Sequence, residues 1–107
     1  MVEPVSGFPV LFGGVPVTDF DAAAQWYERL LDAPPDMLPK EGEACWKLTD
    51  EAWIYVVRDP YRAGNALITI IVDELPPIDA ELVEMGGMLT VEAVDPDGNK
   101  IKFARPR

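Results

Sequence analysis

A repeated order of predicted elements constrains the fold of this chain more than any other feature of its sequence. Each half reads as a strand, a helix and a hairpin, and an internal repeat of this kind predicts two similar units. Residues 17–20 correspond to residues 72–75, and residues 54–58 correspond to residues 101–105. The second copy is the shorter one, so we expect it to lack part of a strand or a loop. The pattern predicts an α+β domain.

The first half has the pattern of a strand followed by an amphipathic helix. Residues 9–17 are mostly apolar, and the glycines and proline within them mark a bulge, a close backbone approach or a sheet edge. Asp19 suits a helix N-cap, and apolar residues at helical spacing continue to about Leu31. A polar loop follows, and residues 44–48 and 53–57 then predict a hairpin.

The second half repeats this order with its strongest strand first. Residues 66–72 are apolar enough to predict a strand covered on both faces. Prolines at the start and a glycine pair at the end predict a helix over 76–85. Residues 88–94 and 100–104 predict the strands of the last hairpin, joined by a turn over 95–98.

The charge and the missing histidine exclude several classes of function. The chain has 107 residues, 9 Lys and Arg, 19 Asp and Glu, a net charge of −10 and no histidine. This acidity argues against nucleic acid and anionic membranes as partners, and it favours a cationic ligand through steering. Without imidazole, the chain lacks the commonest general base, the commonest metal ligand and every nucleophile pair that needs histidine.

The cysteine count and the apolar runs indicate where the protein is found. Cys45 is the single cysteine, so it forms neither an intramolecular disulfide nor a multi-thiolate zinc site. No histidine activates it, and a free cysteine is usually a small buried apolar residue. The start of the chain lacks the basic segment of a signal peptide, and the longest apolar run is too short for a membrane span. We therefore expect a cytoplasmic protein.

Two stretches of the sequence resemble the vicinal oxygen chelate superfamily. One is residues 15–22 with the aromatic pair at 26–27, and the other is Asp95-Pro96-Asp97-Gly98-Asn99 before the last strand. This superfamily includes glyoxalase I, bleomycin-resistance proteins and extradiol dioxygenases. The resemblance implies two βαβββ modules, about 8–59 and 65–105, in one domain over residues 1–107. Their strands would form an incomplete barrel-like sheet around a cup, with the second module shortened. It also implies a homodimer.

The resemblance further implies where metal ligands would stand, and those positions hold unsuitable residues. In metal-dependent members, inward-facing strand positions carry histidine or glutamate. The matching positions here are occupied by Phe12, Tyr55, Leu67 and Lys102. Phenylalanine and leucine have no donor atom, and an ammonium group repels a divalent cation. We therefore predict no metal, no cofactor and no catalytic residue.

The same positions supply the candidates for a ligand site. If the cup binds a small molecule, we expect five side chains to line it: Phe12, Trp46, Tyr55, Leu67 and Lys102. Aromatic side chains suit the apolar walls of such sites, although most strand aromatics belong to a core. Lys102 would meet an anionic group of the ligand if it faces the cup, whereas most strand lysines face solvent.

Three functions are compatible with these residues. The first is a metal-independent protein that binds a small molecule of unknown identity, and we favour this function and binding over catalysis. The second is a divalent-metal-dependent lyase, isomerase or dioxygenase of the same superfamily, which would have to build its site from carboxylates. The third is a non-catalytic dimerising module with a filled cup. The abundant acidic pairs are typical of a solvated surface.

Overall fold

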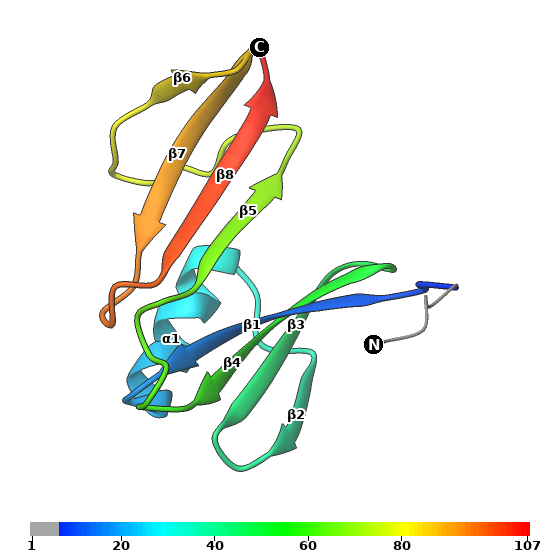
Figure 1. Ribbon diagram of the computed structural model, residues 1–107, viewed down its shortest axis with the longest axis vertical. Helices are drawn as coiled ribbons and strands as arrows, with labels where there is room; N and C mark the ends of the chain where they lie inside the picture. The colour runs from blue at the N-terminus through cyan, green and yellow to red at the C-terminus, as the bar shows by residue number, and fades with distance from the viewer. Residues whose placement is uncertain (1–6) are drawn as a thin grey trace, which may run out of the picture.

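The computed structural model describes residues 7–107, whose strands form two four-stranded sheets beside a helix (Figure 1). The elements, in chain order, are β1 (Leu11–Val17), α1 (Phe20–Leu31), β2 (Met37–Lys40), β3 (Glu43–Thr49), β4 (Ala52–Arg58), β5 (Leu67–Ile71), β6 (Val83–Met85), β7 (Met88–Val94) and β8 (Lys100–Pro106). Within this part of the chain, no helix is long and apolar enough to span a membrane.

The two sheets have the same topology, which confirms the repeat. The first has the strand order β1-β4-β3-β2, with β1 parallel to β4. The second has the order β5-β8-β7-β6, with β5 parallel to β8. In each, the remaining neighbours are antiparallel. The sheets do not close into a barrel, and the protein has the two-module α+β architecture that the sequence predicted.

Helix α1 forms where it was expected and covers one face of the first sheet. The Asp19 carboxylate accepts a hydrogen bond of 3.1 Å from the backbone N–H of Ala22, as an N-cap should. Ala23 and Tyr27 are one helical turn apart and are both buried against the sheet. The helix ends at Asp32, whose left-handed backbone (φ 53°) is a common helix terminator.

The helix predicted over residues 76–85 is wrong. Residues 73–82 are neither helix nor strand, and Val83–Met85 form β6, which pairs with β7. The Thr90 hydroxyl donates to the Val83 carbonyl at 2.9 Å and so helps to hold this short strand in place. The prolines do not account for the outcome, because the first turn of a helix tolerates them. Leu82 and Met85 are exposed, so the segment buries no apolar face that would stabilise a helix. The second module is therefore shortened at its helix, and not in a strand or a short loop.

Two strand predictions also need correction. The segment expected as a polar loop contains β2, which adds a fourth strand to the first sheet. The strand predicted over 66–72 forms as β5, but it is not covered on both faces, since Leu67 is 73% and Ile71 is 63% exposed. Its side chains alternate between a packed face and an open one, and apolar composition alone does not distinguish these two cases.

A buried polar network joins the two modules at the predicted turn. Asp95 and Asn99 are both buried. The Asn99 amide donates to the Pro16 carbonyl of β1 and to the Asp95 carboxylate, each at 2.8 Å, and its oxygen accepts from the Ala66 N–H at 2.8 Å. The Tyr27 hydroxyl donates to Asp95, also at 2.8 Å. Residues from β1, α1, the start of the second module and the β7–β8 turn therefore meet at one point.

Candidate functional site

The face of the first sheet opposite α1 carries two of the aromatic side chains predicted to bind a ligand, Phe12 and Tyr55. Side chains alternate along a strand, so the register that pairs Phe12 with Trp53 and Cys45 with Tyr55 places all four on this face. The rings of Phe12 and Trp53 stack with centroids 5.3 Å apart, and the rings of Phe12 and Tyr55 are 6.4 Å apart. We call this the open face of the first sheet.

Gly14 makes room for the Tyr55 ring. These two residues are direct partners in the parallel β1–β4 pair. A Cβ atom at Gly14 would lie 2.5 Å from the Tyr55 Cζ and 2.6 Å from its hydroxyl oxygen, far inside van der Waals contact. The ring therefore lies across the β1 backbone. The glycine that appeared in the sequence as a strand interruption has a definite role, which is to permit this close approach.

Two hollows flank Tyr55 on the open face. One has a volume of about 350 Å³ and is lined by Phe12, Met37, Pro39, Glu43, Cys45 and Tyr55. The other, of about 320 Å³, lies toward the segment between β4 and β5 and is lined by Gly14, Pro16, Tyr55, Val57, Asp59, Arg62, Asn65 and Ala66. Both volumes fall at the small end of the range for small-molecule sites. Tyr55 is the residue that the two hollows share.

The charged groups at the second hollow are tied to each other. The Arg62 guanidinium donates to the Asp59 carboxylate at 2.7 Å, and this hydrogen bond lowers the pKa of Asp59. Neither group was a candidate in the sequence, because the segment lies where the two predicted modules join. The only signal for the site in that region was the pair of glycines in β1, which indicated a close approach without naming its partner.

The remaining candidates lie elsewhere in the chain. Trp46 is on the opposite face of the first sheet, 1% exposed beneath α1, and its indole N–H donates to the Ala33 carbonyl at 2.9 Å. It is a core residue and does not line the open face. Neighbouring side chains on a strand point in opposite directions, so Trp46 faces the core while Cys45, the residue before it, faces the other side of the sheet.

Leu67 and Lys102 share the open face of the second sheet. Lys102 is half-buried between Thr69 and Glu92, its partners on the two neighbouring strands. Leu67 lies on the same face, two residues before Thr69. Neither residue is among those lining the two hollows around Tyr55. Within one chain, the structure thus brings Phe12 and Tyr55 together and holds Leu67 and Lys102 apart from them.

The four residues that the sequence resemblance places at metal-ligand positions do not fit a metal ion. Phe12, Tyr55, Leu67 and Lys102 offer one phenol and one ammonium group between them, on two separate sheets. Within residues 7–107, no three His, Cys, Asp or Glu side chains are grouped to hold a metal. Cys45 is buried, and burial together with the nearby Glu43 carboxylate raises its thiol pKa, so it is protonated and a poor nucleophile.

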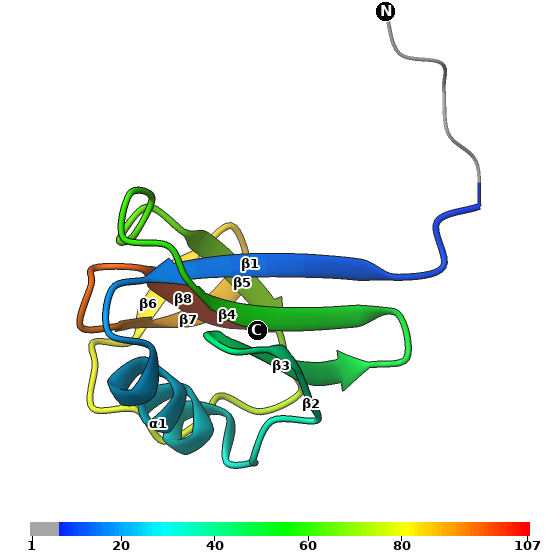
Figure 2. The ribbon, with the colours of Figure 1, turned by 90° about the horizontal axis from the view of Figure 1, so that it is seen from below.

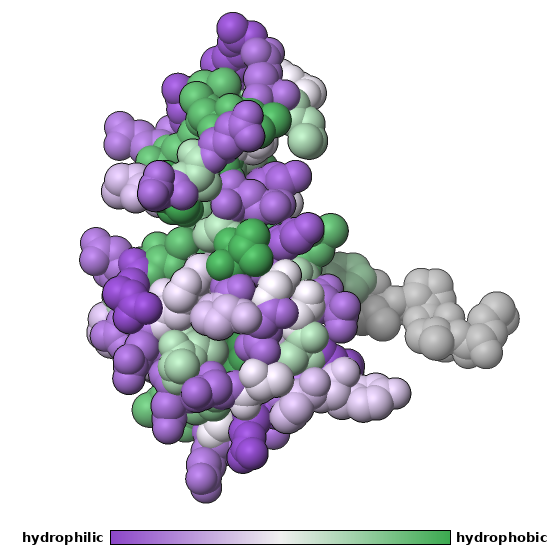
Figure 3. Space-filling view, turned by 90° about the vertical axis from the view of Figure 1, so that its left-hand side faces the viewer, coloured by the Kyte–Doolittle hydropathy of each residue, from purple (hydrophilic) through white to green (hydrophobic). Residues whose placement is uncertain are grey.

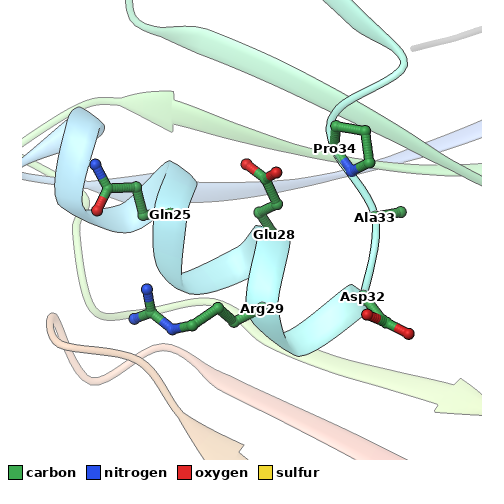
Figure 4. Close-up of a pocket in the computed structure, with 6 residues that line it drawn as sticks. All are labelled: Gln25, Glu28, Arg29, Asp32, Ala33 and Pro34. Atoms are coloured by element: carbon green, nitrogen blue, oxygen red, sulfur yellow. The ribbon is translucent and has the colours of Figure 1, made fainter.

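A hollow of about 430 Å³ beside the C-terminal end of α1 has a different character (Figure 4). Its lining is mainly the exposed polar surface of the helix, including Gln25, Glu28 and Arg29. Figure 4 shows these side chains extending from the helix without converging on one point. The hollow therefore has no arrangement that would orient a ligand.

Solved structures provide the comparison with known proteins. A glyoxalase/bleomycin-resistance protein from Catenulispora acidiphila is 37% identical to this chain, over 92% of this chain and 98% of that one, with a TM-score of 0.81. A bleomycin-binding protein complexed with bleomycin is 19% identical (91% and 98% covered, TM-score 0.65). Lactoylglutathione lyase from Agrobacterium tumefaciens is 13% identical (95% of each chain covered, TM-score 0.68).

No family model matches the sequence, and no curated protein matches it. The last two structures are similar in fold alone, since their identities are low. The first is different, because more than a third of its residues are identical over nearly its whole length. The repeated topology, the Asp95–Asn99 turn and this identity agree, and the chain belongs to the glyoxalase/bleomycin-resistance family of the vicinal oxygen chelate superfamily.

Proposed function

We propose that this protein binds a small molecule without a metal ion, against the open face of its first sheet, as a homodimer. The observation that carries the proposal is the Tyr55 site. Two hollows meet at an aromatic ring, and their walls combine apolar side chains with a few polar groups, among them Glu43, Arg62 and Asn65. Apolar walls with a small number of polar groups are typical of small-molecule sites. The bleomycin-binding protein of the same fold supports a binding role.

The open face of the second sheet supports the homodimer. Five exposed aliphatic side chains share this face, as the register of the strands requires: Leu67, Ile71, Val83, Met85 and Val94. They lie mostly on the two edge strands, β5 and β6, with Lys102 and Glu92 between them, and this number of exposed apolar side chains on a small protein favours a partner surface. A second copy is the occupant that we propose, since most small oligomers are symmetric homodimers.

In the proposed dimer, the remaining candidate residues, Leu67 and Lys102, would contribute to the ligand site. Leu67 and Lys102 lie on the face that the second copy covers, so a Lys102 ammonium could approach the Tyr55 hollows of another protomer. There it would meet an anionic group of the ligand or the Glu43 carboxylate. A single chain offers no such meeting, because its own Lys102 is outside both hollows.

Oligomeric state tests the dimer directly. We expect light scattering to give a dimeric mass for the unmodified protein and a monomeric mass for Ile71→Lys, because a buried unpaired charge opposes association. Tyr61→Lys changes a side chain that is 95% exposed on a loop and should leave the dimer intact. A monomeric mass for the unmodified protein at about 0.1 mM would contradict the dimer, because a dimer with a Kd of about 1 μM is largely associated at that concentration.

Ligand binding is tested with a panel of planar aromatic compounds that includes bleomycin. We expect at least one compound to raise the melting temperature and to bind with saturation in a titration. Phe12→Ala removes a half-exposed ring from the site and should weaken that binding about tenfold, since a stacked pair contributes up to about 1.5 kcal/mol. Tyr61→Ala is the matched control. Binding that is insensitive to Phe12→Ala would place the ligand elsewhere.

Metal independence has its own test. Elemental analysis of the purified protein should find less than stoichiometric Mn, Fe, Ni and Zn, and a chelator should leave the titration unchanged. Stoichiometric metal that is lost together with ligand binding would instead favour the lyase, isomerase or dioxygenase alternative.

A further inference from the structure

A large apolar cavity lies where the second module lacks a helix. It has a volume of about 720 Å³ and lies between the C-terminal end of α1, the end of β5 and the segment that leads to β6. Figure 2 shows this segment passing close to α1. An α-helix with its side chains is about 10 Å wide, and a single extended segment is thinner. Residues 73–82 therefore cover the second sheet incompletely and leave this space.

The walls of the cavity are those of a small-molecule site. They are mostly aliphatic, with one aromatic ring: Leu30, Leu31, Leu48, Ile70, Val72, Ile78 and Phe103. Four of these belong to α1, β5 and β8 and also pack in the core, so the walls are held in place. The volume lies within the range of about 300–1,000 Å³ that ligand pockets occupy. Figure 3 shows hydrophobic surface near the middle of the molecule, below the second sheet.

The charges at the rim identify the kind of ligand. Asp32 and Glu74 contribute two carboxylates and Arg29 contributes one guanidinium, and none of the three forms an ion pair within residues 7–107. In Figure 4 the Arg29 guanidinium extends back along α1, away from Asp32. The C-terminal end of α1, which lines the cavity, adds the negative end of a helix dipole. The rim is therefore electronegative.

We propose that this cavity is a second binding site, separate from the Tyr55 hollows, for an apolar molecule that carries one ammonium group. The aliphatic walls take the hydrocarbon part, and the ammonium group lies at the rim between Asp32 and Glu74. No residue is shared between this cavity and the two hollows on the open face.

Octylamine, 1-octanol and octanoate are matched probes for this site, because they differ mainly in the charge of the head group. NMR titration of the full chain should give saturable shifts of the Ile70 and Ile78 methyl groups with octylamine. We expect octylamine to bind about fivefold more tightly than octanol, as one exposed ion pair contributes at most about 1 kcal/mol, and octanoate to bind most weakly.

Two substitutions separate the cavity from the charge. Ile78→Trp fills the cavity from a loop position and should abolish the octylamine shifts, whereas Leu38→Trp, on exposed β2, should not. Asp32→Asn combined with Glu74→Gln keeps the cavity and should remove the preference for octylamine over octanoate. Asparagine tolerates the left-handed backbone at position 32.

Several results would overturn the proposal. The proposal is wrong if octylamine shifts only Tyr55 and Phe12, if octanoate binds as tightly as octylamine or more tightly, or if no shift saturates. These outcomes come from the titration of the unmodified protein, so they can be observed even if a variant fails to fold. A change of oligomeric state in Ile78→Trp would show that a second copy occupies the cavity instead. Phe12→Ala, which tests the proposed function, should leave the octylamine shifts unchanged.

Discussion

At the scale of single residues, two close contacts organise this protein. Gly14 lets the Tyr55 ring lie against β1, and Tyr27 donates a hydrogen bond to the buried carboxylate of Asp95. The first contact shapes the proposed ligand site, and the second joins α1 to the second module. The first contact depends on the absence of a Cβ atom at Gly14 and the second on the hydroxyl group of Tyr27, so a conservative substitution can test each one.

Gly14→Ala should displace the Tyr55 ring and alter the ligand site more than the stability of the fold. The new Cβ would meet the end of the ring, which can swing outward into the neighbouring hollow. Chemical shifts of the Tyr55 ring would report the movement. Gly13→Ala is the control, since its Cβ would meet Ile68 at an ordinary 3.7 Å. An unmoved Tyr55 ring in Gly14→Ala would mean that β1 yields instead.

Tyr27→Phe should lower the free energy of unfolding by about 1.5–3 kcal/mol, the contribution of a hydrogen bond to a charged group. Burial and the adjacent Asp95 carboxylate raise the pKa of Tyr27 above its ordinary value near 10. The stability from this phenol is therefore complete below about pH 10 and is lost as pH rises further, when the unfolded chain ionises first.

Urea unfolding at pH 7 and about pH 10.5 checks both parts of this prediction. The stability difference between the unmodified protein and Tyr27→Phe should shrink at the higher pH. Tyr61→Phe, at a 95% exposed position, should match the unmodified protein at both values. The ionisation of Cys45 is common to all three proteins and cancels in the comparison.

At the scale of elements, α1 is the piece whose limits were clearest in the sequence. Its N-cap, its apolar spacing and its end before the prolines all agreed, and the helix forms within these limits. The segment 76–85 had comparable end signals and apolar residues at helical spacing, but two of these residues, Leu82 and Met85, are exposed and bury no apolar face. Start and stop residues mark where a helix fits, whereas burial of an apolar face decides whether it forms.

Asp19→Ala should lower the free energy of unfolding by about 1 kcal/mol, the usual cost of losing an N-cap. Asp21→Ala is the matched control. It removes a carboxylate from the same helical turn without removing the hydrogen bond to Ala22, so its effect should be smaller. Equal losses for the two variants would mean that only the charge, and not the cap, stabilises α1.

The ligand site was harder to predict than the elements around it. Phe12 and Tyr55, which the superfamily resemblance identified, lie together on the open face, whereas Trp46, predicted with them, lies on the opposite face. A single residue of register moves a side chain to the other side of a sheet. Arg62 and Asn65 come from a turn whose path depends on the packing of both modules, which local sequence patterns do not specify.

At the scale of the whole molecule, the modules share one core and the network around Asn99. Buried side chains from both sheets form a single cluster, and Asn99 bonds to residues before β5 and within β1. Neither module therefore has a complete interior without the other. Cooperative unfolding is the consequence, as expected for a small domain with one core.

This cooperativity has a direct spectroscopic check. All three tryptophans, at positions 26, 46 and 53, lie in the first module, so their fluorescence reports that module alone. Isoleucine methyl signals from β5 and β8 report the second. We expect both probes to give the same urea midpoint. Asn99→Ala, which removes the links to Pro16 and Ala66, should lower that midpoint and is the variant in which two separate midpoints would first appear.

The position of β8 has a consequence for synthesis on the ribosome. This strand is the last of the second sheet to be made, yet it lies between β5 and β7, which do not pair with each other. Strands β6 and β7 can pair before it is made. Strand β5 waits unpaired until residues 100–106 leave the exit tunnel, and its aliphatic side chains stay open to chaperones during that time. The first sheet has no such delay, because its central strand β4 emerges before the second module begins.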